Sequence, residues 1–407
     1  MRILIVSDQE TSGGAAISTT NLVNGLLLSG QDEVYRLVIF HDGRVPAWRR
    51  IELWQRDTLV KKVLMRLFGK LPQGSRNRLA NMRFRKVLKE IRPDVVNFHN
   101  ILWGRAMGLS LEMVSIAEAY CRTYVTMHDM WTIVGFPYDL RMVPDKRILD
   151  EWTLPEEHLK GRSEAELFKE RQVFFRKGRI GFIAPSNWIA RELMSRYPFL
   201  EERLKVIPYG IETGIFKPAI RDDSGSLPDN KTRKIVVLAS AASLSHVNKG
   251  FHVLLYALQR RDNSDIRLLL MGEDSEVRNI AFPETLEVEF LGFVSDKEQK
   301  AVVYNRADCL AFPSFADNLP NTVIESISSG TPVIAFNAGG ISDLVVNGVT
   351  GWICERIDLD EYGKTFESAV QQLKQGARMR DTCRDFALKN FTLESQAMKY
   401  RDLFNNN

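Results

Sequence analysis

Two carboxylates, Asp317 and Glu325, stand eight residues apart in the stretch SFADNLPNTVIESISSGTPVIAF, residues 314–336. A helix that begins at NTVIES places Asp317 in the preceding loop and Glu325 about one turn inside. Pro320 suits the first turn, because it has no N–H to leave unpaired there. The N–H groups of residues 321–323 would then point out of the helix N-terminus, where they and the helix dipole favour an anion such as phosphate. The pattern predicts a phosphate site with an acid on either side.

Three further short stretches place chemically useful groups at the ends of predicted strands. SGGAA, residues 12–16, is a glycine loop where backbone can approach a ligand closely, although it lacks the third glycine of the dinucleotide fingerprint. His128 and Asp129 follow the predicted strand TYVTM. Lys249 stands before a predicted helix and suits a phosphate as a point charge. The alternatives are a tight turn, a structural histidine and a solvated lysine.

Alternating apolar strands and helices predict the α/β elements that hold these residues. The alternation runs through residues 1–216, stops at the polar linker 217–233 and restarts over residues 234–392. It predicts two Rossmann-like, doubly wound parallel-sheet domains, with the last helix, 393–407, packed back on the first domain. Open sheets of this kind bind ligands at the carboxyl ends of their strands, so we expect the two domains to face a cleft that holds the site.

Two stretches break the alternation and are interpreted as insertions in the first domain. Residues 136–170 are rich in proline and charge, with a helix expected only from Ser163. Residues 44–92 carry 15 Lys and Arg against three acids. Within them, DTLVKKVLMRLFGKL, residues 57–71, has the pattern of a basic amphipathic helix that could lie on an anionic membrane surface. A helix packed on its own domain with a solvated basic face is the alternative.

Composition excludes several classes of protein. The chain has 407 residues, 44% hydrophobic and 26% charged, which is ordinary for a globular protein. A net charge of +4 is too small to indicate nucleic acid, and four scattered cysteines give no zinc site and fit a reducing compartment. No run of 18 apolar residues occurs, and the N-terminus MRILIVSDQE is interpreted as a first strand and not a signal peptide. We therefore expect a cytoplasmic protein.

Residues 316–353, ADNLPNTVIESISSGTPVIAFNAGGISDLVVNGVTGWI, resemble the nucleotide-sugar site of the retaining GT-B glycosyltransferases of family 4. The signature of that family is an acid, seven residues and then Glu. The similarity extends over nearly the whole chain, and it is supported by SGGAA, the HD pair, IAPSNWIA, VIPYGIETGIFKP, NKGFHVLLYAL and LGFV.

The resemblance implies a role for each matching residue. Asp317 would bind hydroxyls of the donor sugar, His128 would lie at the reacting centre, and Glu325 would hold the nucleoside ribose. The remaining donor-binding positions are expected to meet the sugar and diphosphate: Gly14, Lys249, Asn318, Leu319, Asn321 and Thr322. Leu244 departs from the family, which often has Arg there, so Ser243 or Ser245 and helix dipoles are expected to meet part of the diphosphate charge.

The expected activity is transfer of a hexose, from UDP-glucose by preference, to an acceptor hydroxyl with the anomeric configuration retained. No metal or other cofactor is expected, because no Asp-x-Asp pair lies near the site and helix N-termini with Lys249 take the place of a cation. The expected acceptor is a saccharide or lipid-linked saccharide of a surface polysaccharide, which would make the protein peripheral on the inner membrane face. The alternatives are an inverting or glycogen-synthase-like transferase and a non-catalytic sugar-nucleotide-binding subunit.

Overall fold

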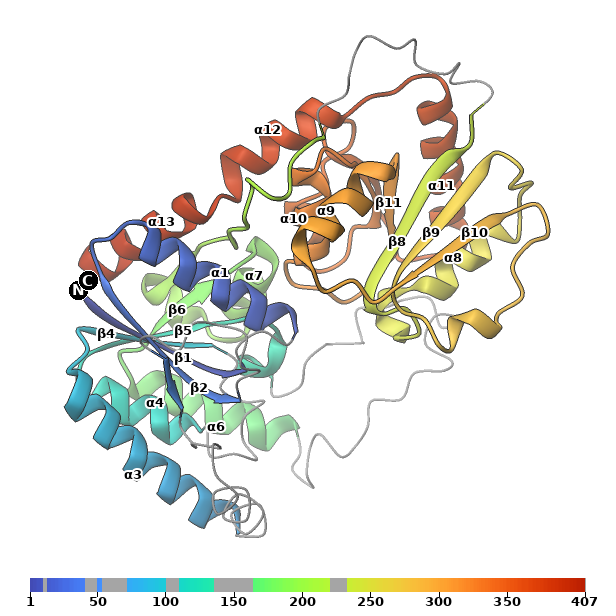
Figure 1. The fold of residues 1–407 in the computed structure, drawn as a ribbon. Helices are drawn as coiled ribbons and strands as arrows, with labels where there is room; N and C mark the ends of the chain where they lie inside the picture. Colours follow the sequence, from blue (N-terminus) through green and yellow to red (C-terminus); the bar gives the residue numbers. More distant parts are fainter. Residues whose placement is uncertain are drawn as a thin grey trace, which may run out of the picture. The chain divides into compact units, whose positions relative to one another are not determined.

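The computed structural model describes residues 1–9, 13–40, 50–52, 72–99, 110–134, 164–219 and 233–406. These residues separate into two compact units (Figure 1). The first unit contains the described residues up to Gly210 together with the C-terminal segment that begins at Leu393, and the second contains Ile211–Thr392. The chain thus passes between units before the sequence-based boundary at residue 216.

Parallel strands in the order β3-β2-β1-β4-β5-β6-β7 form the sheet of the first unit. Its strand order reverses between β1 and β4. The strands are β1 (Arg2–Gln9), β2 (Glu33–Phe40), β3 (Arg50–Glu52), β4 (Val95–His99), β5 (Arg122–Thr126), β6 (Gly181–Ala184) and β7 (Leu204–Val206). The helices are α1 (Gly14–Leu28), α3 (Gln73–Ile91), α4 (Leu111–Glu118), α6 (Glu164–Lys177), α7 (Asn187–Arg196) and α13 (Leu393–Asn406).

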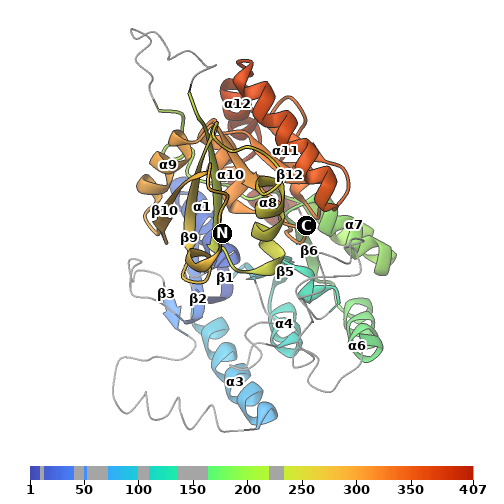
Figure 2. The ribbon, with the colours of Figure 1, turned by 90° about the vertical axis from the view of Figure 1, so that its right-hand side faces the viewer.

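Successive strand residues point to opposite faces, so each face of this sheet has its own core. Leu4 and Val6 lie in one buried cluster with apolar side chains of α3, α4, α6 and α7. Ile3 and Ile5 lie in the other cluster with side chains of α1 and α13. Figures 1 and 2 show α3, α4 and α6 on one side of the sheet. The C-terminal helix is therefore an integral part of the first unit.

The sheet of the second unit has parallel strands in the order β10-β9-β8-β11-β12-β13 and reverses between β8 and β11. The strands are β8 (Ile235–Ser243), β9 (Ile266–Glu273), β10 (Glu287–Gly292), β11 (Cys309–Phe312), β12 (Val333–Phe336) and β13 (Gly351–Cys354). The helices are α8 (Phe251–Leu258), α9 (Lys297–Arg306), α10 (Asn321–Ser328), α11 (Leu359–Lys374) and α12 (Arg380–Asn390). Helix α11 packs on α8, and α10 packs on α9 and α12.

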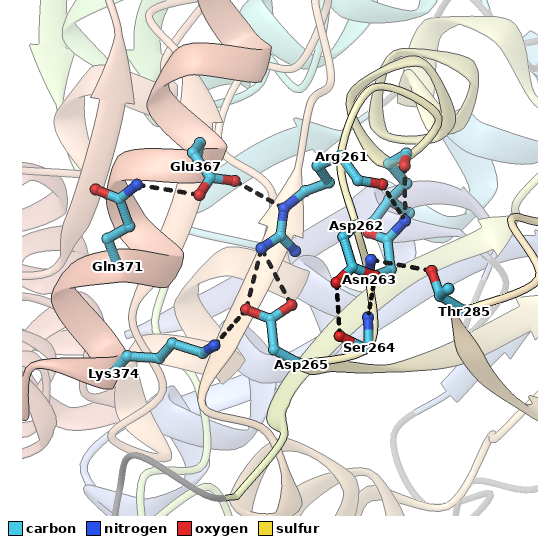
Figure 3. A network of polar contacts seen from close by, with 10 residues as sticks. Arg261, Asp262, Asn263, Ser264, Asp265, Thr285, Glu367, Gln371 and Lys374 are labelled. Carbon is cyan, nitrogen blue, oxygen red and sulfur yellow. Dashed lines mark hydrogen bonds and ion pairs between the residues drawn. The ribbon is translucent and has the colours of Figure 1, made fainter.

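A polar network fastens the turn between α8 and β9 to α11 (Figure 3). The guanidinium of Arg261 donates to Glu367 at 2.7 Å and to Asp265 at 3.1 Å. Lys374 completes the network with an ion pair to Asp265 at 2.5 Å. These groups line an open groove of about 810 Å³ and bond to one another across it. The network therefore stabilises the packing of α11 on the sheet.

Both predicted α/β sheets are present, and the α/β fold class is confirmed. Three details of the prediction were wrong. Residues 73–91 are not part of an insertion, because α3 buries Phe84 and Leu88 in the core of the first unit. The alternation of strands and helices predicts a helix between β12 and β13, but the structure has only a 3-10 turn there, Ile341–Asp343. Helices α11 and α12 were not predicted. The amphipathic segment 57–71 and most of the linker 217–233 lie outside the described residues.

The packing of α13 predicts that truncating its last apolar side chain destabilises the first unit. Phe404 is fully buried and its ring lies 5.0 Å from that of Tyr124 in β5. Phe404→Ala should lower the free energy of unfolding by about 3–5 kcal/mol through lost burial and a cavity. Met398→Ala, on the same helix but 57% exposed, is the matched control and should change it little. Urea unfolding followed by circular dichroism measures both, and equal effects would contradict this account of α13.

Candidate functional site

The loops that follow β8 and β11 carry the polar residues predicted in the second unit. These two strands are neighbours and lie at the point where the strand order reverses. A crevice forms outside the carboxyl ends of parallel strands at such a point, because the connecting loops diverge to opposite faces. Lys249 belongs to the loop after β8, and Asp317 to the loop after β11. The fold thus brings together residues that are 68 positions apart in the sequence.

An ion pair joins the two loops. Lys249 Nζ lies 2.8 Å from Asp317 Oδ1 and 2.9 Å from Oδ2. The two side chains are only 26% and 16% exposed, so solvent screens the pair less than it would a surface pair. The Ser314 hydroxyl lies 2.6 Å from Asp317 Oδ2 and 2.8 Å from the Asn248 carbonyl, so it contacts both loops. The arrangement presents one cation and one carboxylate in a fixed geometry.

Two glycines allow the backbone around this pair to pack closely. Gly250 has φ +70°, and a Cβ there would lie 2.0 Å from the Pro313 carbonyl oxygen. Gly339 has φ +59°, and its Cβ would lie 2.0 Å from the Asp317 carbonyl oxygen. Only glycine fits such contacts in this left-handed conformation. The same Asp317 carbonyl accepts a hydrogen bond from the Gly340 N–H at 3.0 Å, so the loop is held from both sides.

Glu325 is a buried carboxylate one turn inside α10, as the sequence predicted. Tyr304 of α9 donates its hydroxyl to Glu325 Oε2 at 3.0 Å, and Lys300 Nζ lies 3.8 Å from the same oxygen. Burial raises the pKa of Glu325, whereas Lys300 and the Tyr304 hydroxyl lower it. Burial and Glu325 raise the pKa of Tyr304 well above its ordinary value, whereas the Ser240 and Thr322 side chains lower it. Sequence reasoning missed Tyr304 and Lys300, because they lie one turn apart on α9 and belong to no recognisable motif.

The N-terminus of α10 differs in one respect from the prediction. The helix begins at Asn321 after Pro320, as expected, but the Val323 N–H already donates to the Pro320 carbonyl at 3.1 Å. Val323 is therefore not among the amides available to a phosphate. In the loop ahead of the helix, Asn318 and Leu319 are both buried.

Leu244 is buried at the position where the family often has Arg. Ser243 and Ser245 next to it hydrogen-bond each other at 3.0 Å. Position 244 thus supplies no positive charge, and in this loop it is Lys249 that contacts the Asp317 carboxylate.

In the first unit, the strand order reverses at β1 and β4, and predicted residues again follow strands at that edge. Gly14 is the exposed first residue of α1, directly after the loop that follows β1. His128 follows β5, the neighbour of β4. The structure places both residues at the carboxyl edge of this sheet, where open α/β sheets bind ligands.

His128 is not an isolated histidine. Its Nε2 lies 2.8 Å from Nδ1 of His99, the last residue of β4, and its Nδ1 lies 2.6 Å from the Tyr209 hydroxyl. Burial lowers the pKa of His128 to about 3, so the ring is neutral at physiological pH. Sequence reasoning missed both partners, although NFHN and VIPYGI place polar side chains directly after predicted strands.

Two family models match the chain in the same order as the two units. The model of Glycosyltransferase Family 4 matches residues 12–214, and that of Glycosyl transferases group 1 matches residues 234–372. The chain belongs to this family. Its fold is accordingly GT-B, and the match covers the loops that hold His128, Lys249, Asp317 and Glu325.

Individual relatives are distant. The D-inositol 3-phosphate glycosyltransferase of Pseudarthrobacter chlorophenolicus is 28% identical over 213 residues, which are 47% of each chain. The chain spans about half the length of the curated relatives it matches. Two solved structures match over the full length of both chains. Anabaena HepE in complex with UDP and glucose has a TM-score of 0.64 and 16% identity, and sucrose-phosphate synthase from Thermosynechococcus elongatus has a TM-score of 0.69 and 18% identity. At such identities they support the fold.

Two features are absent from the part of the chain that the structure describes. None of the helices in that part of the chain is both long and apolar enough to cross a bilayer. The same residues contain no group of three or more His, Cys, Asp or Glu side chains placed to hold a metal ion. Metal independence stays a prediction that needs a direct test.

The close backbone contact at Gly339 predicts that a single methyl group disturbs the Asp317 loop. Gly339→Ala combines a left-handed φ, which costs about 1–2 kcal/mol, with a clash against the Asp317 carbonyl. Gly348→Ala is the matched control, because Gly348 has φ +73° but open space around its Cβ position. Thermal unfolding should show the larger loss of stability for Gly339→Ala. Equal losses of stability in the two variants would mean that the Asp317 loop moves away from the added methyl group without a loss of free energy.

Proposed function

We propose that the protein is a retaining glycosyltransferase that moves a hexose from a nucleoside-diphosphate sugar, with UDP-glucose first, to an acceptor hydroxyl. One observation carries the proposal: the Lys249–Asp317 pair, the N-terminus of α10 and the buried Glu325 follow two adjacent strands of one sheet. A cation and a helix N-terminus suit a diphosphate. Carboxylates suit the hydroxyls of a sugar and a ribose, which are hydrogen-bond donors. Family membership supports this use of the residues.

In the proposed reaction, the bond from the anomeric carbon to the diphosphate oxygen breaks, and a bond from that carbon to the acceptor oxygen forms on the same face. The acceptor proton passes to the leaving phosphate. Negative charge develops on the diphosphate, where Lys249 and the backbone amides of Asn321 and Thr322 would stabilise it electrostatically. Asp317 would bind the sugar and Glu325 the ribose, while Asn318, Leu319 and Gly14 would shape the pocket.

The choice of UDP-glucose draws support from the HepE structure, which is in complex with UDP and glucose. The similar proteins do not agree on an acceptor, because one is named for inositol 3-phosphate and another for sucrose phosphate. A saccharide or lipid-linked saccharide of a surface polysaccharide stays our proposal, with a cytoplasmic location. Thermal-shift screening against UDP, GDP, ADP and their sugars identifies the donor, because a ligand that binds only the native state raises its apparent stability. No shift with any of them would overturn the proposal.

Removing Lys249 or Glu325 should each lower transfer at least about tenfold, since each contact contributes roughly 1–3 kcal/mol. Glu325→Ala should act mainly by weakening nucleotide affinity, measured by calorimetry with UDP. Lys234→Ala is the matched control, because Lys234 is an exposed, ion-paired residue at the opposite end of β8. Unchanged UDP affinity in Glu325→Ala would contradict the ribose assignment.

Treatment with EDTA should leave transfer largely intact. The reasoning is that the N-terminus of α10 and Lys249 meet the diphosphate charge without a divalent cation. The measurement is release of UDP with and without chelator, followed by addition of Mg²⁺ or Mn²⁺. Loss of activity that a metal restores would overturn this part of the proposal.

The proposed membrane contact can be tested on α3, because the segment 57–71 lies outside the described residues. Helix α3 exposes Leu79 and Met82 between cations at helical spacing: Arg78, Arg85, Lys86 and Lys89. Such a surface suits an anionic membrane, where each cation contributes about 1 kcal/mol. Lys86→Glu with Lys89→Glu should abolish flotation with acidic vesicles at low salt. The control pair Lys364→Glu with Lys389→Glu makes the same change in net charge on α11 and α12 and should leave flotation intact. If both pairs abolish flotation equally, vesicle binding depends on net charge and not on the surface of α3.

A further inference from the structure

A chain of buried hydrogen bonds in the first unit ends at His128 and Tyr209. It begins on α13 and crosses β5 and β4, and every member except the partly exposed His128 is at least nine-tenths buried. The groups in order are Tyr400, Thr126, Asn97, His99, His128 and Tyr209. Since each hydroxyl and each neutral imidazole has one proton to donate, the contacts determine the direction of every bond.

The contact of His99 with Thr19 fixes the proton of His99. The Thr19 hydroxyl donates to the Ala15 carbonyl at 2.7 Å, and a carbonyl can only accept. Its single proton is therefore used, and its contact with His99 Nδ1 at 3.2 Å requires that Nδ1 carries a proton. His99 is then an Nδ1–H donor.

The other end of the chain gives the same direction. Thr126 donates its hydroxyl to Asn97 Oδ1 at 3.1 Å, which turns the amide nitrogen of Asn97 towards His99. Asn97 Nδ2 lies 3.0 Å from His99 Nε2 and donates to it, so Nε2 carries no proton. His99 is thus neutral, in agreement with the pKa of His99, which burial, His128 and Arg36 hold well below its ordinary value.

The same reasoning sets the protonation of His128. The one proton on His99 Nδ1 is shared between the Thr19 hydroxyl at 3.2 Å and His128 Nε2 at 2.8 Å, so Nε2 accepts in the shorter of the two contacts. The proton of a neutral His128 must then lie on Nδ1, where it is donated to the Tyr209 hydroxyl at 2.6 Å. This is the less common tautomer of a free histidine side chain. Protonating Nε2 as well would bring two N–H groups face to face.

Charged and titratable groups surround the chain on several elements. Arg36 of β2 lowers the pKa of His99. Tyr400 of α13 and Asp129, which follows β5, raise the pKa of Tyr209. Burial is the cause that lowers the pKa of His128 itself. A neutral ring is therefore favoured by both burial and hydrogen-bond geometry.

We propose that His99 and Asn97 are positioning residues of the reacting centre, which hold His128 as a neutral ring with its proton on Nδ1. The role of this ring in transfer rests on the proposed function. With both nitrogens bonded to protein groups, His128 neither gives nor takes a proton during transfer. The direction of the hydrogen bonds does not depend on the reaction.

Nitrogen NMR of the whole protein with 15N-labelled histidine tests the assignment without any activity. The ring signals of His128, identified as those lost in His128→Gln, should show a proton on Nδ1 and no titration from pH 5.5 to 8. In His99→Leu, which lacks the donor, the proton of His128 should move to Nε2, and the pKa of the ring should rise above that of the wild type, because no N–H group then opposes a proton on Nε2. A wild-type His128 that titrates in this range, or carries its proton on Nε2, would overturn the proposal even if His99→Leu does not fold.

The pH profile of transfer provides the second measurement. His99→Gln keeps an N–H donor beside His128 and serves as the conservative rescue. On the acid side, kcat/KM of His99→Leu should begin to fall at a higher pH than that of His99→Gln, because the N–H donor kept by Gln opposes protonation of the His128 ring. Parallel profiles would overturn the positioning role. Absence of transfer in the wild type would overturn the proposed function alone, since the NMR result stands by itself.

Discussion

The ion pair of Lys249 and Asp317 is the interaction on which the proposed donor site of the second unit depends. It connects two loops that leave adjacent strands, and it does so where solvent screening is weak. A partly buried charge that loses its partner is costly, so each residue keeps the other in place. Because Leu244 is apolar, a diphosphate bound at the proposed site would have to share Lys249 with the Asp317 carboxylate. Donor binding would then be accompanied by a rearrangement of this pair.

Desolvation governs the first unit in another way. His128 hydrogen-bonds the neutral side chains of His99 and Tyr209, and the bonds continue from His99 through β4 and β5 to α13. Neutral groups can be buried provided that each donor finds an acceptor, and this requirement fixes the protons along the chain. One unit thus places formal charges at the proposed diphosphate site, while the other keeps the His128 ring uncharged.

Most strands and the start of α10 followed from the sequence, because apolar runs and a proline before NTVIES are local signals. The positions of Asp317, Glu325 and Lys249 followed from their motif. His99, Tyr304 and Tyr209 did not, since their importance arises from contacts with residues far along the chain. Helix α3 was misjudged because its many cations hid the apolar spacing of Phe84, Val87 and Leu88. The Lys249–Asp317 contact itself depends on strand order, which no local pattern specifies.

The place of α13 has a consequence for how the chain is made. The first unit is discontinuous, because its sheet is covered in part by a helix that follows the entire second unit. On the ribosome, Ile211–Thr392 can complete its core while the first unit still lacks Tyr400 and Phe404. Domains usually fold in order of synthesis. Here the unit that emerges first is the last to be completed, and limited proteolysis of ribosome-bound chains that stop before Leu393 would reveal it as the digestible half.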